Sequence, residues 1–131
     1  MIVVDTNVIA YLWIPGISTA AAERLYREDP EWCAPLLWRS ELRNVLVEHV
    51  RHRRMALDTA IRIVEAAQEQ LRGREFEVAS ERVLQAASAS RCSSYDCEFV
   101  ALARELGLQL HTNDRKILRD FPDVARPLTA A

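Results

Sequence analysis

Four acidic residues occupy positions from which carboxylates could bind a metal ion. Asp5 and Asp114 follow short hydrophobic segments, in the stretches VVDTN and LHTND. Glu41 and Asp96 lie in segments whose apolar residues have the three- and four-residue spacing of helices. Carboxylate oxygens are ligands that suit Mg²⁺ and Mn²⁺. If the fold brings the four acids together, they would form an all-oxygen site.

The two acids that follow hydrophobic segments also have a simpler interpretation. Asp5 could cap the helix that begins behind it, and Asp114 could cap a helix that begins at RKIL. A side-chain oxygen at such a position accepts hydrogen bonds from the first N–H groups of the helix. For either residue alone, the sequence leaves both the cap and the ligand open.

Glu41 is harder to explain without a ligand. Its helix has an apolar stripe, which consists of Leu37, Trp38, Leu42, Val45 and Leu46. Glu41 is four residues after Leu37 and four before Val45, so helical spacing puts it on the buried face.

Asp96 extends a second apolar stripe by one helical turn. That stripe consists of Phe99, Val100, Ala103 and Leu106. An Asp in the first turn can also simply complement the helix dipole. Buried carboxylates must nevertheless be paired, protonated or bound to a metal. No Lys or Arg falls on either stripe, since Arg39, Arg43 and Arg104 lie on other faces of their helices.

Short apolar segments alternate with amphipathic helical patterns along the whole chain. Strands are predicted at residues 2–4, 32–34, 76–78 and 108–112, with a last strand from residue 124. Helices are predicted after residue 7 to residue 12, from 18 or 19 to about 28, and at 35–52, 57–71, 80–89, 93–106 and 114–121. Gly, Pro and cap residues mark the ends of these helices.

This alternation predicts an α/β fold, a three-layer α/β/α sandwich with a central, mainly parallel sheet. A chain of 131 residues suits one domain over residues 1–131. In such sheets, sites form beyond the carboxyl ends of the strands. Asp5 and Asp114 follow predicted strands at that edge.

Composition is that of an ordinary globular protein. Half of the residues are hydrophobic, and 17 Lys and Arg against 19 Asp and Glu give a net charge of −2. Neither a membrane-spanning segment nor a signal peptide is visible, so we expect a cytoplasmic protein that does not contact the membrane. Cys33, Cys92 and Cys97 are an odd count without a secretion signal, so we expect reduced thiols.

Four stretches resemble the motifs of PIN domains in their order and spacing: VVDTNV, SELRNVL, SYDCEFVALARELG and LHTND. The whole chain is similar to VapC-type toxin ribonucleases. The resemblance implies that the catalytic and metal-binding residues are Asp5, Glu41, Asp96 and Asp114, supported by Asn7 and Thr112. Asp5 and Asp96 match the most dependable ligand positions of the family, and Asp114 matches the least uniform one.

One residue departs from the family pattern. His111 stands where the family usually has an aliphatic strand residue. We interpret it as a partly buried strand residue and not as a catalytic base. Thr6, between Asp5 and Asn7, has no assigned role.

The resemblance implies a Mg²⁺-dependent endoribonuclease, with Mn²⁺ as a substitute, that is the toxin of a type II toxin–antitoxin system. It also implies an RNA substrate, a cognate antitoxin and a homodimer. One alternative is a PIN nuclease that processes RNA without an antitoxin. Another is a catalytically silent PIN module that binds RNA or protein, although the presence of all four acids argues against it. A receiver-like domain is disfavoured, because two of the acids lie on helices and no Lys ends a late strand.

The net charge of −2 does not by itself suggest a nucleic-acid binder. Without the four site acids, 17 basic residues stand against 15 acidic ones, a net charge of +2. Arginines gather on and just after one predicted helix, at Arg39, Arg43, Arg51, Arg53 and Arg54. They could contact phosphates or simply form a solvated helix face. The helices at 36–52 and 57–71 are predicted to form a hairpin that could receive a partner helix or pack within the domain.

Overall fold

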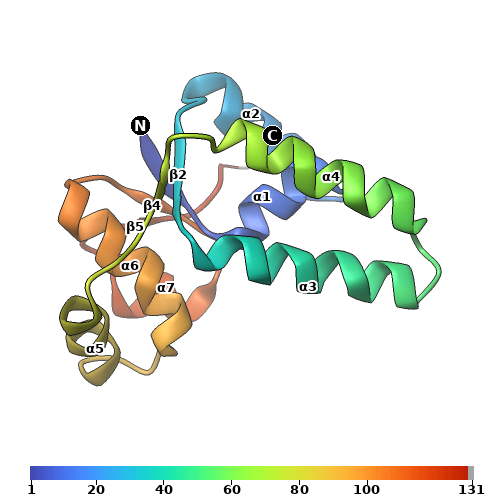
Figure 1. Ribbon diagram of the computed structural model, residues 1–131. Helices are drawn as coiled ribbons and strands as arrows, with labels where there is room; N and C mark the ends of the chain where they lie inside the picture. The colour runs from blue at the N-terminus through green and yellow to red at the C-terminus, as the bar shows by residue number, and fades with distance from the viewer. Residues whose placement is uncertain (130–131) are drawn as a thin grey trace.

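A five-stranded parallel sheet forms the centre of the protein in this computed structural model, which describes residues 1–129. The strand order is β3-β2-β1-β4-β5, and all four pairings are parallel. The strands are β1 (Ile2–Val4), β2 (Trp32–Pro35), β3 (Glu75–Phe76), β4 (Leu110–His111) and β5 (Ala125–Arg126). Because the strands run in one direction, their carboxyl ends meet at one edge of the sheet (Figure 1).

Seven helices connect and cover the strands within the described residues. They are α1 (Thr6–Trp13), α2 (Thr19–Glu28), α3 (Leu37–Arg51), α4 (Leu57–Gln70), α5 (Ser80–Ser88), α6 (Ser94–Leu106) and α7 (Arg115–Asp120). Helices α1 to α4 lie on one side of the sheet, and α5 and α6 lie on the other (Figure 1). The predicted three-layer α/β/α sandwich is therefore confirmed. The predicted hairpin is also present, and α3 and α4 extend together away from the sheet.

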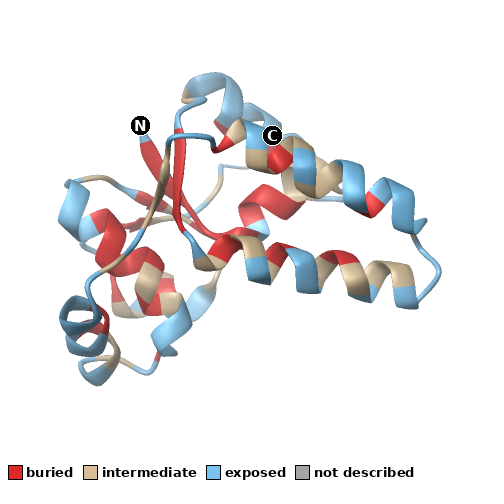
Figure 2. Cartoon of the chain, in the orientation of Figure 1, coloured by how far each residue is buried: buried red, intermediate tan, exposed pale blue. Residues whose placement is uncertain are grey.

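The core lies on both faces of the sheet. Val3 and Val4 of β1 are completely buried, as are Trp32 of β2 and Leu110 of β4. Strands of a parallel sheet covered on both faces are apolar at successive positions, which accounts for the continuous hydrophobic runs in the sequence. Figure 2 shows the burial on the strands and on the helix faces that turn toward them.

Several predicted boundaries were wrong. Pro35 does not open α3 but ends β2, where it pairs with Phe76, and α3 begins at Leu37. Proline lacks an N–H group and cannot donate a hydrogen bond to the sheet, which is consistent with its place at the end of the strand. Strands β3 and β4 have two residues each, and the segments predicted at 76–78 and 108–112 are wrong in extent. A strand extends only as far as its neighbour pairs with it. β1, which pairs with β4, has only three residues.

The inward stripe predicted for α6 also ends earlier than expected. Leu106 is the last residue of that helix and is 37% exposed. Gly107 follows with a left-handed φ of +67°, a conformation that favours glycine and ends the helix there.

Cys33, Cys92 and Cys97 are free and buried, as predicted for reduced thiols. Within residues 1–129, no helix is long and apolar enough to cross a bilayer. The predicted single domain covers residues 1–131, of which 130 and 131 lie outside the described part of the chain.

Candidate active site

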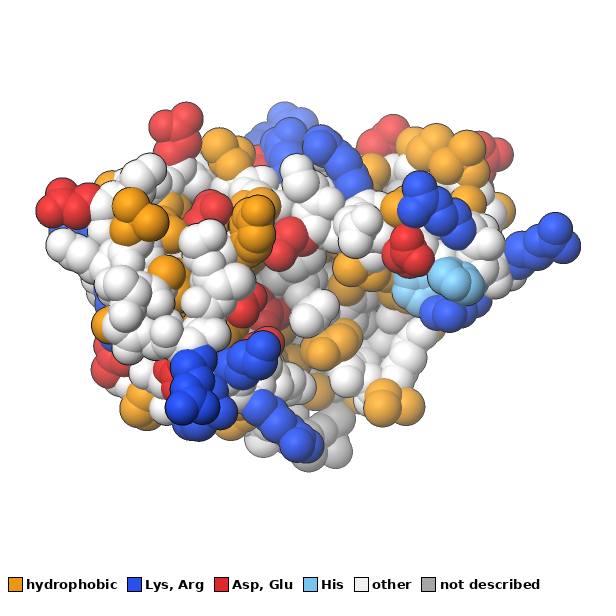
Figure 3. Space-filling view, turned by 90° about the horizontal axis from the view of Figure 1, so that it is seen from below, with side chains coloured by type: hydrophobic (Ala, Val, Ile, Leu, Met, Phe, Trp, Pro, Cys, Tyr) orange, Lys and Arg blue, Asp and Glu red, His pale blue; other side chains and the backbone are white. Residues whose placement is uncertain are grey.

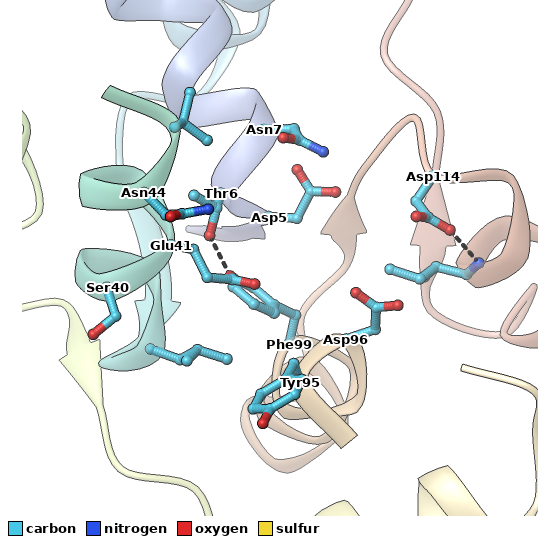
Figure 4. A pocket seen from close by; sticks show the side chains of 13 residues that line it. Asp5, Thr6, Asn7, Ser40, Glu41, Asn44, Tyr95, Asp96, Phe99 and Asp114 are labelled. Carbon is cyan, nitrogen blue, oxygen red and sulfur yellow. Dashed lines mark hydrogen bonds between the residues drawn. The ribbon is translucent and has the colours of Figure 1, made fainter. Parts of the chain in front are cut away.

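All four predicted acids line one cavity of about 410 Å³ beyond the carboxyl ends of the strands. Figure 4 shows Asp5, Glu41, Asp96 and Asp114 around this acid cavity, on four different segments of the chain. Figure 3 looks from below onto a hollowed face where acidic side chains gather. The fold therefore brings together residues that are separated by up to 109 positions in the sequence.

Asp5 follows β1 and is only 7% exposed. One of its oxygens accepts a hydrogen bond from the N–H group of Val8 at 3.0 Å, so Asp5 does cap α1. The other oxygen accepts a hydrogen bond from the hydroxyl of Thr112. Burial raises the pKa of Asp5 to about 6, although both hydrogen bonds act in the opposite direction. Asp5 is thus predominantly ionised at neutral pH.

Asp114 caps α7 in the same way. Its Oδ1 accepts hydrogen bonds from the N–H groups of Lys116 at 2.9 Å and Ile117 at 3.0 Å. Its own N–H group donates to Thr112 Oγ1 at 2.9 Å. Thr112, completely buried, therefore connects Asp114 to Asp5, at the position where the resemblance predicts a supporting residue.

Glu41 reaches the cavity from α3 and is half-buried. Its Oε1 accepts a hydrogen bond from the hydroxyl of Thr6 at 2.7 Å. Burial raises the pKa of Glu41, and the charge of Asp96 acts in the same direction. The role of Thr6 was not found in the sequence, because its partner is 35 residues away and the contact exists only where α1 packs against α3.

Asp96 reaches the cavity from the first turn of α6. Its N–H group donates to Ser93 Oγ at 3.1 Å, which caps the helix. Burial raises the pKa of Asp96, and the charge of Asp114 raises it further. The hydrogen bond with Ser93 and the charge of Lys116 lower that pKa. The two carboxylates are therefore close enough to interact electrostatically across the cavity.

Asn7 lines the cavity but is exposed. Within residues 1–129 its side chain forms no hydrogen bond to any of the four acids, so Asn7 does not position them through a direct hydrogen bond. His111 is half-buried in β4, burial lowers its pKa, and it is not among the residues that line the cavity. These features fit the interpretation of His111 as a strand residue.

Three further polar residues line the cavity and were missed in the sequence. Ser40 and Asn44 lie on α3, one residue before Glu41 and three after it. Helical spacing from Glu41 would have placed Asn44 on the same face. Tyr95 precedes Asp96 and is 61% exposed, and no periodic signal distinguishes it.

No ion pair neutralises the negative charge of the cavity within the described residues. Its lining residues include no Lys, Arg or His, and none of the four carboxylates forms an ion pair within the described residues. Arg39, on another face of α3 as predicted, is bound instead to Glu75 at 2.6 Å. Four oxygen-bearing acids without a paired cation fit the chemistry of a divalent metal ion.

The carboxylates are spread around the cavity. Across residues 1–129, no three Asp, Glu, His or Cys side chains are gathered closely enough to bind one ion as they stand. The oxygen atoms of the four acids fit a divalent cation, although the four carboxylates lie apart from one another in the structure.

Comparison with known proteins agrees with this geometry. The family model described as PIN domain matches residues 2–126. Ribonuclease VapC3 from Pyrobaculum aerophilum is 30% identical over 129 residues, which are 96% of this chain and 98% of that protein.

Two solved structures have the same fold. The crystal structure of PAE2754 from Pyrobaculum aerophilum superposes with a TM-score of 0.76 and 21% identity, over 96% of this chain and 89% of that one. A toxin–antitoxin complex from Klebsiella pneumoniae contains a chain with a TM-score of 0.72 and 17% identity, over 100% of this chain and 98% of that one. As its motifs predicted, this chain belongs to the PIN domain family and is similar to a VapC ribonuclease within it.

Proposed function

We propose that this protein is a Mg²⁺-dependent endoribonuclease and the toxin of a type II toxin–antitoxin system. The observation that carries the proposal is the acid cavity, where four carboxylates without a paired cation converge beyond the sheet of a PIN domain. The similarity to a ribonuclease over nearly the whole chain supports RNA as the substrate. Mn²⁺ would substitute for Mg²⁺, since both ions prefer oxygen ligands.

Each acid has a role in this proposal. Asp5 and Asp96 would hold the main metal ion, and Glu41 and Asp114 would hold a second ion or orient water. A bound divalent cation would neutralise the charge of the phosphodiester and activate the attacking water. Thr112 and Thr6 fix the orientation of Asp5 and Glu41 through their hydrogen bonds. Attack of water on phosphorus with departure of the 3′ oxygen leaves a 5′-phosphate and a 3′-hydroxyl.

The proposed partners are an RNA substrate, a cognate antitoxin and a second copy of the chain. The fold of this chain is shared with a member of a toxin–antitoxin complex, which supports the antitoxin. The homodimer and the cytoplasmic location stay predictions from the sequence.

The decisive experiment compares RNA cleavage by the wild type with that by Asp5→Asn and Asp96→Asn. We expect each variant to lose at least about 100-fold in rate, because each removes a charged metal ligand. EDTA should abolish wild-type cleavage, and Mg²⁺ or Mn²⁺ should restore it. Circular dichroism checks that the variants are folded.

Asp58→Asn is a matched control, because Asp58 is an exposed acid in the first turn of α4, outside the acid cavity. It should cleave RNA like the wild type. Full activity in EDTA, or in either site variant, would contradict the proposal.

Induced expression in cells tests the toxin assignment separately. We expect growth arrest that Asp5→Asn abolishes and that the product of a neighbouring small reading frame relieves. RNA cleavage without growth arrest, and without such a reading frame, would instead identify a nuclease of RNA processing.

A further inference from the structure

A second cavity, of about 250 Å³, adjoins the acid cavity between α1, α3 and the loop that follows α1. We call it the side groove. Its lining includes Asn7, Tyr11, Ile14, Thr19, Val45 and His49. Asn7 and Val45 also line the acid cavity, so the two cavities are contiguous.

Two helical stripes form the walls of the side groove. On α1, Asn7 and Tyr11 are four residues apart and thus share one face, and Ile14 follows directly after the helix as its C-cap. On α3, Glu41, Val45 and His49 repeat every four residues. Because α1 packs against α3, both stripes run from the acids into the groove. A ligand bound at the acids would therefore meet this groove on one side.

The loop after α1 is held in place by Thr19. Its hydroxyl donates to the carbonyl oxygen of Tyr11 at 2.8 Å and accepts from the N–H group of Gly16 at 2.9 Å. The third wall of the groove is thus fixed by hydrogen bonds before any ligand binds.

Besides Asn7 and Ser18, two larger polar side chains in the groove are available to a ligand. The phenol of Tyr11 and the imidazole of His49 are half-buried, and neither forms a side-chain hydrogen bond within residues 1–129. Ile14 and Val45 provide apolar surface beside them. The groove lining contains no Lys or Arg, so it does not suit a phosphate. Apolar walls with hydrogen-bonding groups beside them suit the flat face and polar edge of a nucleobase.

We propose that the side groove binds the base of the nucleotide next to the scissile phosphate, and that Tyr11 and His49 hydrogen-bond to its edge. The inference rests on the proposed function, since it places the phosphate at the four acids. Unpaired RNA is the substrate class that fits, because only an unstacked base can enter such a groove. Tyr11 and His49 are then specificity-determining residues that take no part in the chemical step.

The test is cleavage of short RNAs with randomised bases, followed by sequencing of the cleaved ends. The wild type should prefer particular bases at one position adjacent to the cut. Tyr11→Phe, which removes only the hydroxyl, and His49→Leu should each reduce that preference by roughly 3- to 10-fold, the effect of one lost hydrogen bond. Tyr26→Phe and His52→Leu, whose side chains lie outside the groove, should keep the wild-type preference.

An abasic nucleotide at the preferred position provides a second measurement. It should lower kcat/KM for the wild type and make Tyr11→Phe and His49→Leu equal to the wild type, because the contact they remove is already lost. Variants that remain less active on the abasic RNA would show a merely structural effect and would overturn the proposal.

The remaining outcomes separate this inference from the proposed function. A wild type that cleaves RNA while both variants keep its base preference overturns the groove assignment alone. A change in binding of a protein partner or of a second copy, with base preference intact, does the same. A wild type that cleaves no RNA with Mg²⁺ or Mn²⁺ overturns the proposed function, and the groove assignment with it.

Discussion

Asp5 and Asp114 each serve as a helix cap and as a wall of the acid cavity. In the sequence these two roles were alternatives. The structure shows that they are compatible, because capping through one oxygen leaves the rest of the carboxylate at the cavity. In Asp114 both capping hydrogen bonds end on Oδ1. A strand-end Asp before a helix is thus already oriented by the helix that it caps.

The raised pKa of Asp5 predicts how stability depends on pH when no metal is bound. Its pKa is about 6 in the folded protein against 3.8 in the unfolded chain. Between these values the folded state binds more protons, so the contribution of Asp5 to stability is complete below pH 3.8 and is lost as pH rises through 6. The difference corresponds to up to about 3 kcal/mol.

We therefore expect Asp5→Asn to be more stable than the wild type at pH 7 in EDTA, and to lack this part of the pH dependence. Urea unfolding from pH 4 to pH 7.5 measures both. Glu41 and Asp96 have raised pKa values too, so they contribute the same pH dependence of the free energy of unfolding to both proteins. Identical slopes in variant and wild type would contradict the role given to Asp5.

Thr112 connects the two strand-end acids, so Thr112→Val should affect both. The substitution keeps the shape of the side chain but removes a donor to Asp5 and an acceptor for the N–H group of Asp114. We expect a loss of about 2 kcal/mol in the free energy of unfolding. The pKa of Asp5 should rise further, because the Thr112 hydrogen bond now lowers it. Chemical denaturation and a carboxyl NMR titration check these values, and Thr112→Ser should behave like the wild type.

Among the elements, the first turn of α3 is held to β3 by one carboxylate. Glu75 accepts hydrogen bonds from Trp38 Nε1 at 2.7 Å and from Arg39 Nε and Nη2 at 2.6 Å each. Glu41 lies less than one turn further along the same helix. The contact at Glu75 therefore fixes the part of α3 from which Glu41 reaches the cavity.

Glu75→Leu should destabilise the protein more than Arg39→Met does. It removes the ion pair and also leaves the buried Trp38 N–H group without an acceptor, at a cost of about 2–3 kcal/mol. Arg39→Met keeps the Trp38 bond and breaks only a partly exposed pair, worth about 1 kcal/mol or less. Thermal and urea unfolding compare the two variants. Equal losses would show that the Trp38 bond contributes nothing.

The sequence predicted elements better than it predicted contacts between them. The layers and the order of strands and helices along the chain follow from local patterns of apolar spacing and cap residues. The same patterns place Asp5 at a strand end and Glu41 on the buried face of a helix. The ends of β3 and β4 do not, because a strand stops where its neighbour stops. The Thr6–Glu41 bond and the side groove depend on how α1 meets α3, and no local pattern encodes that packing.

For the whole molecule, the distribution of charge matters more than its sum. The net charge is −2, yet four of the 19 acids line one cavity, and the remainder of the chain has a net charge of +2. Figure 3 shows basic side chains at the margins of the hollow that contains acidic ones. RNA should therefore be repelled at the centre of this face and attracted around it until a cation is bound.

This distribution predicts that two neutralising substitutions differ in effect although they change net charge equally. Glu41→Gln with Asp96→Asn should bind unpaired RNA in EDTA roughly 10-fold more tightly than the wild type, because charge within a Debye length of the phosphates is removed. Glu81→Gln with Glu105→Gln, at exposed sites on α5 and α6, should change affinity by less than about 2-fold. Fluorescence anisotropy at an ionic strength of about 0.1 M, where the Debye length is about 10 Å, makes the comparison. Equal effects would mean that only net charge acts.

The central position of β1 has a consequence for synthesis of the protein on the ribosome. β1 carries Asp5 at the start of the chain, but it pairs with β4, whose residues are made more than 100 positions later. Thr112 and Asp114 arrive with that late strand. A nascent chain therefore has no complete acid cavity until Thr112 and Asp114 have been translated and β4 has inserted beside β1. Fragments that stop before β4 lack Asp114 and the strand that positions it, so the proposed nuclease requires β4 to have been translated.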